Sequence, residues 1–200
     1  FVESTLGLGS SWPTITGTTF DNNDNGSISI DAASLLTLTG NTSTGNAPNG
    51  VRVRGGTIEG NATWGQTNMI YHLYGDVTVA SGSALTIGPG MIFKSNGNRR
   101  LLVAGKLTVA GTSEEPVYFT SYRDDTIGGD TDGGGASSGA PGDWGWIQFL
   151  QTSDDTSVID HAVFRYGGYI TNTSRGNLLI QESSPTISNS TIAYSTHDGI

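Results

Sequence analysis

The sequence contains no cysteine, which excludes disulfide bridges and thiolate chemistry and fits many secreted prokaryotic proteins. Basic residues are scarce too. Lys94 and Lys106 are the only lysines, and the net charge at pH 7 is −9. Nucleic acids and anionic membrane surfaces are bound through a basic face that displaces counterions. The sequence therefore predicts neither as a partner.

Long apolar runs and helical patterns are also missing. No stretch approaches the roughly 18 apolar residues of a membrane span, and no segment keeps apolar residues at i, i+3 and i+4 over three turns. The chain begins without a methionine or a signal peptide, so we expect a mature product or an ordered fragment. What it does contain is 30 glycines and many short runs of Val, Ile, Leu and Thr between Gly, Asn, Asp and Ser. This composition predicts an all-β protein.

Short strands recur in threes between residues 77 and 119. The two groups are 77–79, 85–87 and 91–93, followed by 101–103, 107–109 and 117–119. Matching the groups gives offsets of 24, 22 and 26 residues. Three short strands per turn of about 20–26 residues predict a right-handed parallel β-helix. Within each strand, period-2 alternation points two side chains inward and one outward.

A second pattern marks the corners of the coil. An apolar residue is followed two positions later by Gly, His or Asn, and usually by another apolar residue five positions after the first. The copies begin at Ile15, Leu38, Ile58, Ile159 and Ile187, with Gly17, Gly40, Gly60, His161 and Asn189 at the bend. A sharp corner between strands often requires a positive φ, which we expect at these five bend residues.

A longer repeat joins the two ends of the sequence. Residues 4–20 match residues 176–192 without gaps, 172 positions apart. We interpret the two segments as equivalent positions in successive large units that continue end to end. The predicted organisation has three parts. Residues 1–63 are the C-terminal coils of one stack, 64–69 are a seam, and 70–200 are the N-terminal coils of a second stack, with a Gly/Asp-rich insertion at 123–143.

Several segments resemble a known family. They are YGDVTVASGSALTIGPGMIFK (74–94), LLVAGKLTVAGTSEEPVYFTS (101–121), GDWGWIQF (142–149), IDHAVFRYGG (159–168) and SSPTISNSTI (183–192). These segments are similar to right-handed parallel β-helix repeats of the pectate-lyase-like superfamily, as found in large secreted prokaryotic proteins. The resemblance implies the fold. The superfamily includes lyases, adhesins and surface-layer-like proteins, so it implies no single function.

The acidic insertion is the candidate metal site. It carries four aspartates among glycines: Asp124, Asp125, Asp130 and Asp132. Oxygen ligands on a loop suit calcium, and GDTDGGG resembles a calcium loop with Gly134 in place of the third acid. No glutamate follows at the expected spacing. A solvated loop without metal is the favoured alternative, and we expect no other cofactor.

Aromatic residues offer a candidate sugar-binding surface. In the run 142–149, alternation turns Ile147 and Phe149 one way and two tryptophans the other. The candidate sugar platform consists of four aromatic residues: Trp144, Trp146, Tyr166 and Tyr169. The favoured alternative is burial, with the insertion folding back over the tryptophans.

A candidate catalytic constellation consists of Asp160, His161, Arg165 and Tyr166, because polysaccharide lyases on the resembled fold use clustered carboxylates with calcium and a basic residue. Alternation places His161 at a bend and leaves Asp160 and Arg165 outward, where they would pair with each other. The scarcity of Lys and Arg also argues against a basic groove. We expect no enzyme activity here.

The expected function is that of a non-catalytic extracellular structural β-solenoid. It would form part of a repetitive cell-surface or filament-forming protein, with further copies of itself as the partner through end-to-end self-assembly. The alternatives are an adhesin or polysaccharide-binding module and, less favoured, a polysaccharide lyase or epimerase.

Overall fold

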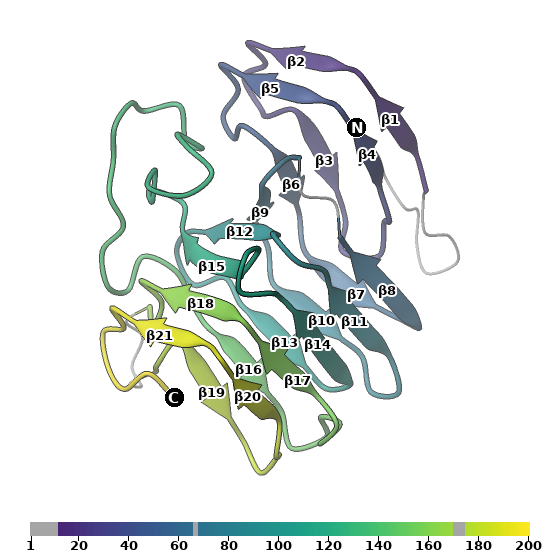
Figure 1. The fold of residues 1–200 in the computed structure, drawn as a ribbon, viewed down its shortest axis with the longest axis vertical. Coiled ribbons are helices and arrows are strands. Elements are labelled where there is room, and N and C mark those ends of the chain that lie inside the picture. The colour runs from purple at the N-terminus through teal and green to yellow at the C-terminus, as the bar shows by residue number, and fades with distance from the viewer. Residues whose placement is uncertain (1–11, 66–67, 170–174) are drawn as a thin grey trace.

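The computed structural model describes residues 12–65, 68–169 and 175–200, and within them the chain forms twenty-one short β-strands and no helix. Every strand pair is parallel, and the chain winds through seven successive coils of three strands (Figure 1). The fold is the predicted right-handed parallel β-helix. In the described residues, no helix long and apolar enough to cross a membrane is present.

Three sheets run along the axis of the coil and form its faces. The first face consists of β7 (Gly56–Ile58), β10 (Val77–Val79), β13 (Leu101–Val103), β16 (Ile147–Phe149) and β19 (Leu178–Ile180). The second consists of β8 (Asn61–Trp64), β11 (Ala84–Ile87), β14 (Lys106–Ala110), β17 (Val158–Asp160) and β20 (Thr186–Ser188). The third consists of β3 (Ile28–Ile30), β6 (Val51–Val53), β9 (Tyr71–Leu73), β12 (Ile92–Ser95), β15 (Val117–Ser121), β18 (Ala162–Arg165) and β21 (Thr191–Ala193).

Four further strands lie in the first two coils. They form two separate pairs: β1 (Thr14–Thr16) with β4 (Thr37–Thr39), and β2 (Thr19–Asp21) with β5 (Thr42–Thr44).

The strand register confirms the predicted coil length. Val77 pairs with Leu101, Leu85 with Leu107, and Ile92 with Tyr118, which gives offsets of 24, 22 and 26 residues. Because these offsets are whole coils, inward side chains stack on inward side chains from one coil to the next.

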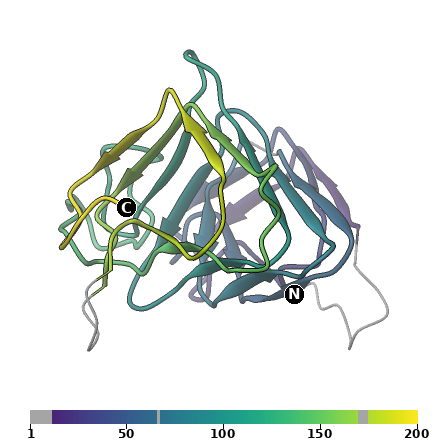
Figure 2. The same cartoon turned by 90° about the horizontal axis from the view of Figure 1, so that it is seen from below.

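Stacked apolar side chains fill the interior of the coil, which Figure 2 views from its C-terminal end. The aromatic rings of Phe93, Phe119 and Phe164 lie directly over one another, with centroids 5.0 and 4.9 Å apart. All three side chains are 2 % exposed or less. This column ties the third-face strands β12, β15 and β18 together from inside.

The predicted corners are confirmed at all five bend residues. Gly17, Gly40, Gly60, His161 and Asn189 have φ of 58°, 63°, 82°, 48° and 48°. The motif occurs at more than one of the corners between the faces of the coil. Its Gly60 copy joins the first face to the second, whereas its His161 copy joins the second face to the third.

His161 adopts a backbone conformation that side chains branched at Cβ rarely tolerate. We expect His161→Val to lower the free energy of unfolding by about 1–2 kcal/mol, because valine crowds this left-handed corner. His161→Asn should leave stability nearly unchanged, since asparagine accepts the conformation. Urea unfolding of the three proteins measures the difference, and equal stability of the Val and Asn variants would contradict the assignment of strain to this corner.

The 172-residue repeat has the same local structure at both ends but a different sheet environment. Residues 4–11 of the first copy lie outside the described residues. The remainder forms β1, the Gly17 corner and β2, and the second copy forms β20, the Asn189 corner and β21. β1 and β2 pair only with β4 and β5, whereas β20 and β21 extend the second and third faces. Equivalence of the two copies in a larger unit stays a prediction.

The predicted seam at residues 64–69 does not coincide with a break in pairing. Residues 66–67 lie outside the described residues, but β6 pairs with β9 across this region, and one apolar core extends from Ile28 to Leu178. An interruption does occur earlier, where the separate β1–β4 and β2–β5 pairs give way to the first and second faces at β7 and β8. The third face alone continues through all seven coils.

Candidate functional site

A row of polar side chains runs along the outside of the third face. The strands of this face turn residues such as Phe93 and Phe119 inward, so the residue after each points outward. Register aligns the outward residues of the seven strands: Ser29, Arg52, His72, Lys94, Thr120, Arg165 and Ala193. We call the segment from Arg52 to Arg165 the basic row. Its members are spaced roughly 4.8 Å apart, one per coil.

The basic row gathers several of the few basic residues, although the scarcity of Lys and Arg argued against a basic groove. Arg52, Lys94 and Arg165 are three of only nine Lys and Arg residues, and they lie far apart in sequence. The coil brings them into one line because their spacings are whole numbers of turns. The sequence does contain a pattern that could have revealed this row. In 51–53, 71–73 and 93–95, a basic residue follows the inward apolar residue of the third strand of each coil.

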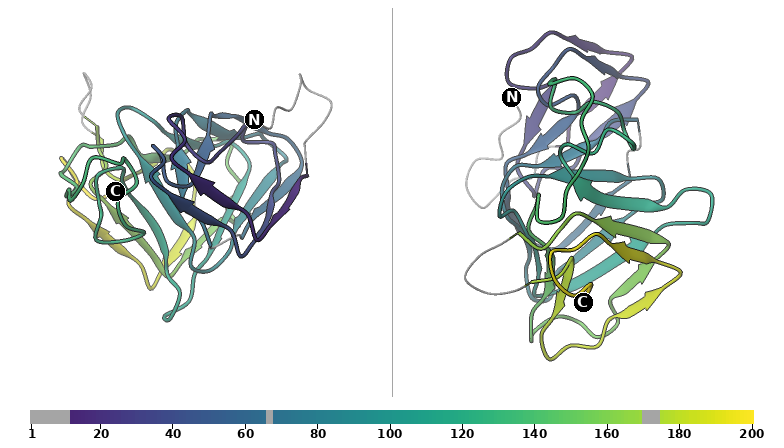
Figure 3. Two further views of the ribbon diagram at one scale, coloured as in Figure 1. Left: turned by 90° about the horizontal axis from the view of Figure 1, so that it is seen from above. Right: turned by 90° about the vertical axis from the view of Figure 1, so that its left-hand side faces the viewer.

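The Gly/Asp-rich insertion lies over this row. Residues 122–143, called the strap here, leave the end of β15 and return before β16 (Figure 1). The right-hand view of Figure 3 shows the strap crossing the N-terminal coils. There, the Asn49 backbone N–H donates to the carbonyl of Thr131 at 3.0 Å, and its side chain donates to the carbonyl of Asp130 at 3.1 Å. The segment predicted as an insertion, residues 123–143, lies within the strap and packs along the stack.

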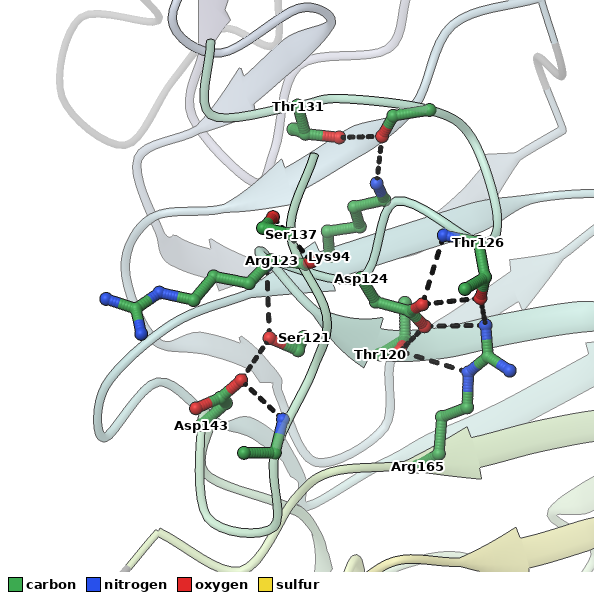
Figure 4. Close-up of polar contacts among 12 residues, drawn as sticks. Lys94, Thr120, Ser121, Arg123, Asp124, Thr126, Thr131, Ser137, Asp143 and Arg165 are labelled. Carbon is green, nitrogen blue, oxygen red and sulfur yellow. Dashed lines mark hydrogen bonds and ion pairs between the residues drawn. The ribbon is translucent and has the colours of Figure 1, made fainter. Parts of the chain in front are cut away.

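An ion pair fixes the strap to the row beside its first turn. Asp124 is fully buried, and its carboxylate lies 2.6 Å from an Arg165 guanidinium nitrogen (Figure 4). Thr120 and Thr126 donate hydroxyl hydrogen bonds to the same carboxylate at 2.5 and 2.6 Å. Burial raises the pKa of Asp124, but these hydrogen bonds and the Arg165 charge outweigh it and hold the pKa below its ordinary value. Asp124 is thus ionised at neutral pH.

The prediction that Arg165 pairs with Asp160 is wrong. Asp160 lies on the second face, where it accepts hydrogen bonds from the Ser188 hydroxyl at 2.7 Å and the Asn189 amide at 2.8 Å. These bonds, with the adjacent His161, lower the pKa of Asp160 to about 2. The four residues of the candidate catalytic constellation are therefore divided between two faces by the corner at His161.

Lys94 occupies the centre of the basic row beneath the strap. Its side chain is fully buried, and its ammonium donates to the carbonyl of Gly129 at 2.6 Å (Figure 4). Burial lowers its pKa, whereas the charges of Asp125, Asp124 and the strap's other aspartates act in the opposite direction. The strap therefore supplies both a backbone acceptor and negative charge to a buried cation.

The four aspartates predicted to bind calcium do not converge on one point. Asp124 faces Arg165, and Asp125 accepts from the backbone N–H of Ser137 at 2.6 Å. Asp130 accepts from two glycine N–H groups at 2.8 and 3.0 Å, and Asp132 accepts from a third at 2.9 Å. In the part of the chain that the structure describes, no three acidic, His or Cys residues are placed to hold a metal ion. The Asp124 carboxylate binds the strap to the row, and the other three carboxylates accept hydrogen bonds within the strap.

His72 lies in the row under an aromatic side chain of the strap. Its ring is 2 % exposed and stacks on Tyr122 with centroids 4.1 Å apart. Burial, assisted by the charges of Arg52 and Arg99 and opposed by the Asn96 side chain, lowers the pKa of His72 to about 4. Among the described residues, neither ring nitrogen has a partner with good hydrogen-bond geometry. The neutral imidazole is the least satisfied group in the row.

The tryptophans predicted as a sugar platform are buried. Trp144 and Trp146 are 2 % and 4 % exposed. Trp144 belongs to the apolar core and donates its indole N–H to the carbonyl of Arg165 at 2.8 Å. The Trp146 ring is close to the guanidinium groups of Arg100 and Arg175, whose carbons are 5.7 and 5.8 Å from its centroid. The favoured alternative of burial therefore holds for both tryptophans, and they form no exposed sugar-binding surface.

The two tyrosines of the same candidate platform are apart from the tryptophan faces. Tyr166 is half-buried and stacks on Tyr194 with centroids 5.3 Å apart. Tyr169 is 38 % exposed and lines a cavity of about 430 Å³ at the base of the strap, together with Tyr122, Asp132 and Asp143. The structure therefore does not assemble the four aromatic residues into one platform.

Comparison with protein families identifies the central coils. Residues 56–179 match the model described as a pectate-lyase like beta helix domain. The match begins at β7, the first strand of the continuous first face, and ends within β19. A search of curated proteins and of solved structures finds no match.

Proposed function

The chain belongs to the pectate-lyase-like β-helix family, and from this premise we propose that it is a non-catalytic structural β-solenoid of the cell surface whose coils continue end to end. The cysteine-free composition rich in Gly, Ser, Thr and Asn supports an extracellular location. The separation of Asp160 and Arg165 onto different faces supports a non-catalytic role, because it leaves the candidate acid and base without a shared reacting point.

The observation that carries this proposal is the incomplete burial of the apolar residues in the last coil. Its inward residues Ile180, Ile187 and Ile192 are only partly buried. Their partners one coil earlier, Phe149, Ile159 and Phe164, are fully buried. Within residues 12–65, 68–169 and 175–200, strands β19, β20 and β21 are each paired with a strand on one side only. An apolar end with unpaired strand edges is stabilised by a further coil stacked on it.

Gly199, near the end of the described residues, forms a hydrogen bond with the last coil. The backbone N–H of Leu178 donates to the carbonyl of Gly199 at 3.1 Å, just as the N–H of Ile147 donates to the carbonyl of Asn177 at 3.0 Å. Gly199 therefore occupies the position relative to β19 that Asn177 occupies relative to β16. The partner we propose for this end is a further coil of the same type, stacked at the strand spacing of roughly 4.8 Å.

End-to-end association of the 200-residue chain is the expected result. Purified protein should form elongated particles whose length grows with concentration, seen by sedimentation velocity and electron microscopy. Ile187→Lys should shift the population to single particles, because a charge at the end face is desolvated by a stacked coil. Thr186→Lys is the matched control on the same strand: it lies on the exposed side and should leave association unchanged. The proposal is contradicted if the protein stays monomeric at all concentrations, or if the two variants lose association to the same extent.

A further inference from the structure

The strap is attached to the coil mainly through polar contacts. Ile127 is its only large aliphatic residue, and that side chain is half-buried. The attachments include the Asp124–Arg165 ion pair, the Lys94–Gly129 hydrogen bond and the two bonds from Asn49, and Tyr122 adds a ring contact with His72. Segments with few buried apolar contacts open at a low free-energy cost compared with the core. The strap is therefore the least firmly attached part of this region.

The strap also closes on itself at its base. Ser137 donates its backbone N–H to the Asp125 carboxylate at 2.6 Å and its hydroxyl to the carbonyl of Arg123 at 2.7 Å. The Ser121 hydroxyl donates to Asp143 at 2.5 Å. Residues 126–136 thus form a loop whose two ends meet, and it can leave the row without disturbing the path of the chain between β15 and β16.

The side chains that the strap covers are not required by the packing of the coil. They stand at outward positions, where the first and last strands of the same face carry Ser29 and Ala193. Burying a lysine and a histidine there is costly unless an acceptor is supplied. The row is therefore built to receive an acceptor-rich partner, which here is the strap.

The strap satisfies the row incompletely. Lys94, Thr120 and Arg165 each bond to it. At the other end of the row, the ring nitrogens of His72, which the Asn96 side chain approaches, and the Nε atom of Arg52 are buried without a hydrogen bond of good geometry among the described residues. Unpaired buried polar atoms cost free energy, so a segment that also bonds to these atoms can displace the strap.

We propose that the basic row, Arg52 to Arg165, is a binding surface for an acidic, glycine-rich peptide segment of a partner protein, and that the strap occupies it in cis. The bound chemistry is that of a peptide. The row's polar groups and Asn49 receive main-chain carbonyls of Gly129, Asp130 and Thr131 as well as the carboxylate of Asp124. Glycines let the backbone approach the strands closely, as at Gly128, where an added Cβ would lie 2.8 Å from the Ile70 side chain.

A strap-deleted protein tests this directly. Residues 126–136 are replaced by a short Gly-Ser linker between Asp125 and Ser137, which frees Lys94 and Asn49 while Asp124 stays on Arg165, and a labelled synthetic peptide with the sequence of residues 126–136 is added. We expect saturable binding by fluorescence anisotropy that weakens as salt rises, because ion pairs carry part of the affinity. The intact protein should bind the peptide at least about tenfold more weakly, since its own strap competes.

Matched variants assign the binding to the row. In the strap-deleted protein, Lys94→Gln should weaken binding about tenfold or more, as expected for the loss of one charged hydrogen bond. Lys106→Gln, on the second face, should leave it unchanged. A peptide with its aspartates replaced by asparagine should bind more weakly in proportion to its lost charge.

Three results would overturn the proposal: a folded strap-deleted protein that does not bind the peptide, equal losses in the Lys94 and Lys106 variants, or tighter binding of polygalacturonate than of the peptide. If the deletion prevents folding, the intact chain carrying Asp130→Asn and Asp132→Asn replaces it. Excess peptide should then accelerate hydrogen exchange at the strap amides of Gly133, Gly135 and Ser137. Unchanged exchange would count against the proposal in the same way.

Discussion

Replacing Phe119 by alanine is expected to lower the free energy of unfolding by about 3–5 kcal/mol, among the largest effects of any single substitution in this protein. Phe119 is the middle ring of the interior column and stacks on both Phe93 and Phe164. Its removal leaves a cavity between two rings that are held by separate coils and cannot close the gap. Urea unfolding followed by circular dichroism measures the loss.

Tyr118 provides the control on the same strand. Its side chain points outward and is half-buried, with the Arg165 guanidinium carbon 5.8 Å from its ring centroid. Tyr118→Ala should cost about 1 kcal/mol, the central value for point substitutions. A loss at Phe119 no larger than at Tyr118 would show that the aromatic column does not carry the coil-to-coil stability that we assign to it.

Replacing Arg165 by methionine is expected to cost about 3–5 kcal/mol, because it leaves the fully buried carboxylate of Asp124 without its counter-charge. Methionine retains much of the apolar stem of arginine, so lost packing is a minor part of the effect. Asp124→Asn combined with Arg165→Met removes the isolated charge and should recover part of the loss. If the double variant is no more stable to unfolding than Arg165→Met alone, the loss does not come from the unpaired charge of Asp124.

The Asp124–Arg165 ion pair also predicts how the destabilisation by Arg165→Met depends on pH. In the intact protein the folded-state pKa of Asp124 is below its ordinary value of 3.8, so its contribution is complete above pH 4 and disappears as pH falls through the lowered folded pKa. Without Arg165 the burial of Asp124 dominates, and its pKa rises. The stability gap between the intact protein and Arg165→Met should therefore be widest at neutral pH and narrow on acidification. Unfolding curves measured between pH 7 and pH 4 test this, and a gap independent of pH would contradict it.

The coil and its corners were accessible from the sequence because they depend on local rules. Strand alternation and turn residues repeat with each coil, so matching 77–93 to 101–119 gave the register that the structure has. The corner motif likewise located five residues with positive φ. The predicted seam is not marked by a break in the core, because Ala62 and Trp64 alternate inward on β8 without the Val and Ile that form strands elsewhere.

The site could not be found in the same way. Arg165 is only five residues from Asp160 in the sequence, but the corner at His161 turns the two onto different faces. Its partner is Asp124, 41 residues earlier, on a strap whose path no strand pattern specifies. The burial of the two tryptophans is likewise not specified by strand alternation. Alternation assigns side chains to the two sides of a strand but does not say what covers each side.

Local sequence patterns are enough to specify an all-β parallel coil with three strands per turn, its register in the central coils and the residues at its corners. These features follow from interactions among neighbouring residues and from a repeat of fixed length. The alignment of Arg52, His72, Lys94 and Arg165 in one row, and the position of the acidic insertion over it, depend on the folded coil. Stacking converts separations of whole coils into contacts of a few ångströms, and the electrostatic partners of a buried charge are fixed by that stacking.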